Sequence, residues 1–88
     1  HRVLIRDGKA VGVEYVQTAG KSRTKVNAYA RQEVILCGGV INSPQLLELS
    51  GIGNKDVLES LGIAVEKDLP GVGENLQDHL TVHITHGL

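Results

Sequence analysis

The sequence lacks methionine, phenylalanine and tryptophan, and two tyrosines are its only aromatic residues. Aromatic side chains supply much of the buried area in small cores, so a chain of 88 residues with only two of them can bury only a modest share of its surface. The apolar faces of the chain are therefore expected to pack against polypeptide beyond it. The first residue is His1 rather than methionine. Both absences predict an internal fragment of a longer protein, holding one domain at most.

Cysteine is also scarce, because Cys37 is the only one. No internal disulfide can form and nothing indicates an oxidising compartment, so a reducing cytoplasm is the default expectation for localisation. The sequence shows no charged leader with an apolar core, and no apolar run approaches the length of a membrane span. With 41% hydrophobic and 22% charged residues, the composition predicts a soluble globular segment.

Charge is unevenly distributed along the chain. Residues 1–31 hold seven Lys or Arg and two acidic residues, a formal charge of +5, whereas residues 32–88 carry a formal charge of −6. Nucleic-acid binding usually combines basic groups with stacking aromatics or a recognised motif, and the basic part has neither. We expect Lys21, Arg23 and Lys25 to lie on a solvated hairpin tip, and we expect no nucleic-acid partner.

The first third of the chain predicts a β-meander. Residues 2–6 and 10–16 are rich in β-branched residues, and Asp7-Gly8 between them suits a two-residue hairpin turn because it tolerates positive φ angles. A polar, glycine-containing loop is expected over residues 17–23, followed by a third strand over residues 24–30. Three successive antiparallel strands result.

The next segment has a different pattern. Residues 34–37 are consecutively apolar and end at Gly38-Gly39, which is typical of a strand buried on both faces in a parallel sheet. Asn42 or Ser43 is expected to cap a helix that has Pro44 at its first position and ends at residues 50–53.

The remaining residues predict a second short helix and little regular structure beyond it. Asn54 is the expected N-cap and Gly62 the C-terminal stop of this helix. A short extended piece is expected over residues 63–66, and residues 81–85 are expected to form a final strand.

A strand, a glycine pair and a capped helix together form a geometry that often binds nucleotides. The glycines allow backbone to approach a ligand closely, and amide groups at a helix start attract anions. The same arrangement also serves simply to turn a chain. The dinucleotide fingerprint G-x-G-x-x-G is absent, so these residues alone leave both interpretations open.

Three ordered blocks carry a more specific signal. The segment EVILCGGVINSPQLLELSGIG (residues 33–53) resembles the second sequence signature of the glucose-methanol-choline (GMC) oxidoreductases. The preceding RVLIRDGKAVGVEYV (residues 2–16) and the following LESLGIAVEKDLPGVGENLQDHL (residues 58–80) resemble the stretches on either side of that signature. One departure is Val40, where the family most often has a small residue such as Ala or Ser.

The resemblance implies an α/β fold that is part of an FAD-binding Rossmann-like domain. Residues 1–31 would form the meander, residues 32–62 the last parallel strand of the FAD domain with the signature helices, and residues 63–88 the crossing toward the substrate domain. The cofactor implied is FAD. The residues implied to lie near its nucleotide or pyrophosphate portion are Cys37, Gly38, Gly39, Asn42 and Ser43.

The activity that the resemblance implies is oxidation of the CH–OH group of a small alcohol, with hydride passing to flavin and electrons to oxygen or another acceptor. The family's catalytic His and its His or Asn partner belong to a later segment, so no catalytic residue is expected here and the isolated fragment is expected to be inactive. Two alternatives stay open: a flavin-containing lyase on the same scaffold, and a non-catalytic remnant or partner-binding module.

Some polar residues invite other functions, which we weigh against simpler ones. Cys37 ends an apolar strand, where a buried inert thiol is commoner than a nucleophile. His79, His83 and His86 do not have the usual metal-ligand spacing, and on a strand His86 would point away from the other two, so no metal site is predicted.

The polar side chains of the NLQDH segment are expected to form hydrogen bonds in a buried turn, mainly with backbone amides. These side chains belong to Asn75, Gln77, Asp78 and His79.

Overall fold

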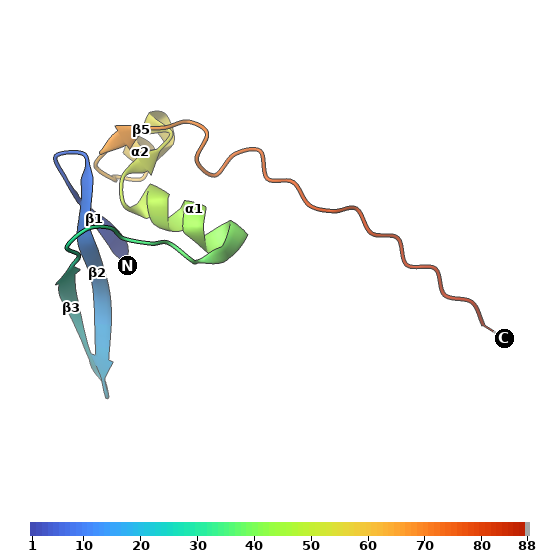
Figure 1. Cartoon of the computed structure of the whole chain (residues 1–88), viewed down its shortest axis with the longest axis horizontal. Helices are drawn as coiled ribbons and strands as arrows, with labels where there is room; N and C mark the ends of the chain where they lie inside the picture. The colour runs from blue at the N-terminus through green and yellow to red at the C-terminus, as the bar shows by residue number, and fades with distance from the viewer. Residues whose placement is uncertain (88) are drawn as a thin grey trace.

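The chain folds into a β-meander, a compact helical part and an extended C-terminal segment (Figure 1). A computed structural model describes residues 1–87. The first three strands form an antiparallel sheet in the order β1-β2-β3, and β4 and β5 form a short parallel pair. This mixture of strands and helices confirms the α/β class. The elements are β1 (Arg2–Arg6), β2 (Lys9–Ala19), β3 (Ser22–Tyr29), α1 (Gly39–Leu49), β4 (Ile52–Gly53), α2 (Lys55–Ser60) and β5 (Lys67–Asp68).

The first hairpin follows the prediction from its turn residues. Asp7 and Gly8 adopt φ angles of 52° and 74°, as a two-residue turn between twisted strands requires. Leu4 pairs with Gly12 and Ile5 with Ala10, so Val11 is an extra residue and forms a β-bulge. A side chain at Gly12 would meet the Ala28 carbonyl oxygen, which explains glycine in the middle of this strand.

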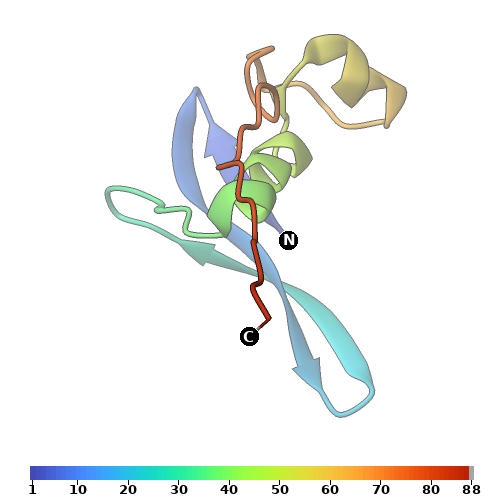
Figure 2. The same ribbon diagram turned by 90° about the vertical axis from the view of Figure 1, so that its right-hand side faces the viewer.

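The second hairpin is longer than the sequence predicts. Residues 17–23 were expected to be a loop, but Gln17 pairs with Thr24 and Thr18 with Arg23, and only Gly20 and Lys21 form the turn. The hairpin projects from the rest of the molecule (Figure 2), and its residues near the turn are exposed. A ribbon exposed on both faces needs no apolar alternation, so its polar residues did not indicate a strand.

The helical part is a small β4-α2-β5 crossover attached to the end of α1. Gly51, with φ of 89°, ends α1 by donating its backbone N–H to the Glu48 carbonyl over 3.0 Å. The Asn54 side chain caps α2 by accepting from the N–H groups of Asp56 and Val57 at 3.0 and 3.3 Å, as predicted. Gly62 follows with φ of 73°, which confirms the predicted stop.

Two predicted strands are not formed within residues 1–87. Residues 33–38 belong to no sheet, with Ile35 78% exposed, and residues 81–85 likewise lie outside any strand. A strand requires a neighbour to pair with its N–H and C=O groups, and no described residue supplies one at either place. The only parallel pairing among the described residues is that of β4 with β5.

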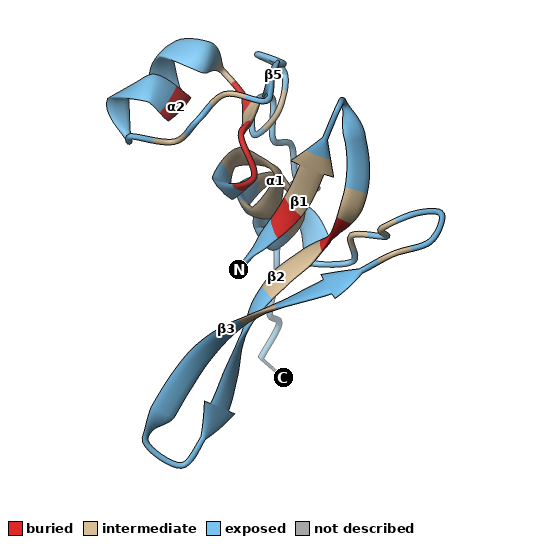
Figure 3. Cartoon of the chain, turned by 90° about the vertical axis from the view of Figure 1, so that its left-hand side faces the viewer, coloured by how far each residue is buried: buried red, intermediate tan, exposed pale blue. Residues whose placement is uncertain are grey.

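The core is small. Val3 and Leu58 are the buried hydrophobic residues of the described chain, and many large apolar residues are exposed. Figure 3 shows that most of the ribbon is exposed. The C-terminal segment runs away from the folded part (Figure 1) and gives the molecule a length of 61 Å. Neither α1 nor α2 has the length and apolar character that a bilayer-spanning helix needs.

Candidate functional site

The glycine pair before α1 forms a sharp turn in which each glycine has its own requirement. Gly38 has φ of −84°, but a Cβ there would lie 3.0 Å from the Ser43 backbone nitrogen, closer than real Cβ atoms normally approach. Gly39 has open space around its Cα, yet its φ of 85° disfavours any side chain. The turn therefore favours glycine at both positions, for different reasons.

The helix begins earlier than the sequence predicts. Neither Asn42 nor Ser43 is its N-cap and Pro44 is not its first residue, because α1 starts at Gly39 with Gly38 as N-cap. Pro44 lacks the N–H that would have bonded to the Val40 carbonyl and its ring crowds that carbonyl, yet α1 continues to Leu49. Ser43 instead turns back, and its Oγ accepts a hydrogen bond from the Gly38 backbone N–H over 2.9 Å.

The start of α1 is suited to an anionic ligand. The first-turn N–H groups of a helix have no intrahelical acceptor, and the helix dipole adds partial positive charge there. No side chain accepts from these amides as a cap, and no acidic residue lies in the first turn. A phosphate beside this turn would meet unpaired donors and no opposing charge.

The remaining two predicted site residues lie at the same turn, and Cys37 differs from expectation in burial. Cys37 is exposed rather than buried, because the strand that would have covered it does not form within residues 1–87. Asn42 is also exposed on the first turns of α1. The five predicted residues are thus brought together at one turn, where all but the half-buried Ser43 are exposed.

A groove of about 620 Å³ runs along most of α1, beside residues 71–77. Val40, Ile41 and Pro44 line its helix side, and Leu76 lies opposite. Gly73 lies directly against the Glu48 carboxylate, which brings the two segments together. Sequence reasoning missed this groove because its walls come from segments far apart in the chain. The one available signal was the adjacent pair Val40 and Ile41, which are 66% and 71% exposed near the helix start.

The polar NLQDH segment makes local contacts only. Asp78 accepts from the His79 backbone N–H over 2.7 Å, and Gln77 donates to the Asn75 side chain over 3.3 Å. Residues 75–79 form no turn and are exposed, which corrects the expectation of a buried turn. The bonding of Asp78 to a backbone amide follows the prediction.

Comparison with known proteins gives a family match over most of the chain. The GMC oxidoreductase family profile matches residues 1–81. Choline dehydrogenase, mitochondrial, of Homo sapiens is 61% identical over 83 residues, covering 94% of this chain and 13% of that protein. The oxygen-dependent choline dehydrogenase of Photobacterium profundum is 55% identical over 85 residues, covering 97% of this chain and 14% of the relative.

A solved structure agrees with these sequence matches. An FAD-dependent oxidoreductase from Chaetomium thermophilum, determined in complex with a small-molecule fragment, superposes with a TM-score of 0.78 at 48% identity. The match covers 88% of this chain and 13% of that one. The chain thus spans 13% to 15% of the length of the relatives named here and of other choline dehydrogenases.

The class that these findings define is an α/β oxidoreductase. The chain belongs to the GMC oxidoreductase family, as the three sequence blocks predict. Because residues 33–38 lie outside any sheet here, the assignment depends on these comparisons and not on the expected parallel strand.

Proposed function

We propose that this chain is an internal segment of an FAD-dependent oxidoreductase that acts on the CH–OH group of an alcohol. The observation that carries the proposal is the 61% identity to human choline dehydrogenase over almost the whole chain. Choline is accordingly the first alcohol to test. Because the chain corresponds to 13% of that relative, activity belongs to the longer protein.

Within that enzyme, the turn at Gly38 and Gly39 is the proposed contact to the nucleotide or pyrophosphate portion of FAD. Three observations support it: unpaired first-turn amides, no acidic side chain in that turn, and open space beside Gly39. Cys37, Asn42 and Ser43 are neighbours in the same proposed site. Ser43 supports the turn through its bond to the Gly38 N–H.

The chain's own contribution is to hold the cofactor, not to catalyse. Bound flavin would supply the hydride acceptor for the alcohol carbon, with oxygen or another acceptor taking the electrons afterwards. Residues 38–43 would bind the cofactor and orient it. The proton of the alcohol is taken by a histidine that the family resemblance assigns to a later segment, so none of the four histidines here is proposed as catalytic.

The proposed division of the chain follows the family pattern. Residues 1–31 form the meander, residues 32–62 belong to the FAD domain and residues 63–88 lead toward the substrate domain. Support for the last part comes from Leu80, Val82 and Ile84, which alternate along the extended segment and are 96%, 76% and 83% exposed. An extended segment with apolar side chains at alternate positions could form a strand by pairing with a sheet beyond the chain.

The test is anaerobic reduction of the flavin in the full-length protein. Adding choline should bleach the visible flavin absorbance, and readmitting oxygen or an artificial acceptor should restore it. The matched control is a choline analogue with hydrogen in place of the hydroxyl group, which keeps the cation and lacks the CH–OH. A purified protein without flavin, or a flavin that no alcohol in a panel bleaches, would refute the proposal.

A further inference from the structure

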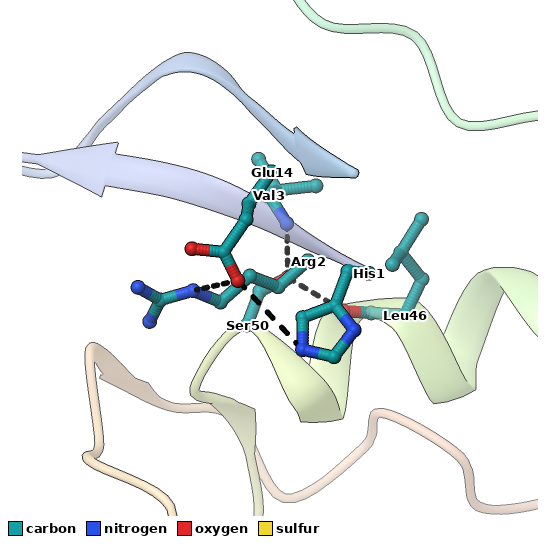
Figure 4. A network of polar contacts seen from close by, with 6 residues as sticks. All are labelled: His1, Arg2, Val3, Glu14, Leu46 and Ser50. Atoms are coloured by element: carbon teal, nitrogen blue, oxygen red, sulfur yellow. Dashed lines mark hydrogen bonds and ion pairs between the residues drawn. The ribbon is translucent and has the colours of Figure 1, made fainter. Parts of the chain in front are cut away.

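One hydrogen bond joins the meander to the helical part of the chain. The Ser50 Oγ accepts from the Val3 backbone N–H over 2.7 Å, across 47 positions in the sequence. Within residues 1–87, no other hydrogen bond or ion pair connects residues 1–30 with residues 39–87. Figure 4 shows Ser50 at the end of α1 pointing toward Val3.

The Ser50 hydroxyl makes two hydrogen bonds. It donates to the Leu46 carbonyl over 2.6 Å while it accepts from Val3, so both its donor and an acceptor lone pair are in use. The residue is only 6% exposed, which leaves little access for water to replace either bond. The bond at the edge of β1 is therefore directional and fixed.

Packing supplies the rest of the anchoring of α1. The helix has no buried residue; it contacts β1 and β4, and Gly73 lies against its Glu48 side chain. An 11-residue helix is about 16 Å long and behaves as a stiff rod, so a shift or tilt at one end is carried to the other. The end opposite Ser50 is the glycine turn.

We propose that Ser50 is a positioning residue for the cofactor turn. By tying the C-terminal end of α1 to the edge of β1, it sets the angle at which the amides following Gly38 and Gly39 meet the pyrophosphate. This inference rests on the FAD site proposed above. It assigns a role in cofactor orientation to a serine that contacts no cofactor.

The experiment compares three variants of the full-length holoenzyme. S50A removes the acceptor for Val3. N54A removes the α2 cap, a loss of comparable effect on stability, without touching α1. S60A removes an exposed hydroxyl whose 2.7 Å bond to the Val57 carbonyl lies within α2. Each apoprotein is titrated with FAD, and the visible circular dichroism of the bound flavin is recorded at saturation.

S50A should raise the FAD dissociation constant roughly tenfold, as expected when a buried N–H loses its partner. It should also alter the flavin circular dichroism at saturation, while KM for the alcohol changes little. N54A and S60A should stay within about twofold of wild type, since neither alters α1. S50T, which retains a hydroxyl, should recover most of the affinity. If S50A does not fold, S50C replaces it, because sulfur fills the site but bonds only weakly.

Equal losses of FAD affinity in S50A and N54A would overturn the inference, because stability alone would then explain them. Wild-type affinity and dichroism in a folded S50A would overturn it too. In both cases the wild-type protein still binds FAD, so the proposed function stands. A wild-type protein that binds no FAD would remove the proposed function and this inference together.

Discussion

At the scale of single residues, the turn before α1 shows how two adjacent glycines meet different physical demands. Gly38 needs space, because a Cβ would crowd the Ser43 nitrogen and the Asn42 carbonyl carbon at 3.0 and 3.1 Å. Gly39 needs conformational freedom, because its φ is 85°. The sequence shows only two adjacent glycines, and the structure is needed to tell the demand for space from the demand for conformational freedom.

G39A should lower the free energy of unfolding of the full-length protein by about 1 kcal/mol, the usual strain of a side chain in the left-handed region. Urea denaturation measures the change. G71A is the matched control, since Gly71 has no positive φ and no neighbour that a Cβ would meet within 4 Å. It should change stability by no more than about 0.5 kcal/mol. Equal effects of the two substitutions would contradict the conformational explanation.

At the scale of elements, local signals were reliable predictors. Asp7-Gly8 indicated the first hairpin, and Asn54 and Gly62 indicated both ends of α2, because each depends on the φ angle or hydrogen bonds of one turn. The helix of the signature was also predicted, although its start was placed at Pro44. That error arose because proline suits a first turn and is usually costly inside a helix, whereas α1 contains Pro44 at its sixth position.

The contribution of the Asn54 cap of α2 to stability can be tested by substitution. N54A should destabilise the full-length protein by about 1 kcal/mol, because the N–H groups of Asp56 and Val57 lose their acceptor. N54D retains an oxygen at the same position and should be close to neutral. Thermal and urea unfolding curves give both values. A neutral N54A would show that the first turn of α2 does not depend on its cap.

Other elements could not be predicted because their partners lie far away in sequence or outside the chain. Residues 34–37 have the apolar composition of a doubly covered strand, yet a strand is a property of two segments, and the second is absent from the described residues. Of the site, the glycine turn was predictable from its motif. Its groove and the Ser50 bond to Val3 were not, because both join segments distant in sequence.

At the scale of the whole molecule, apolar surface exceeds what these residues bury. Val3 and Leu58 are the buried apolar residues among residues 1–87, whereas Ile35, Ile41, Leu80 and Ile84 are each at least 71% exposed. Hydrophobic burial must outweigh the conformational entropy of every ordered residue, and two buried side chains contribute only a few kcal/mol toward it. The exposed groups are the surface that the longer protein is expected to cover.

The 88 residues expressed alone should therefore lack a cooperative fold. We expect a gradual thermal unfolding curve by circular dichroism, poorly dispersed amide signals by NMR, and no alcohol oxidation with added FAD, because the anchor at Ser50 connects two parts that have little core between them. The full-length holoenzyme, studied under the same conditions, is the control and should unfold cooperatively. A sharp transition with dispersed signals, or any turnover, would mean that the meander and α1 are held together more strongly than one hydrogen bond and two buried side chains allow.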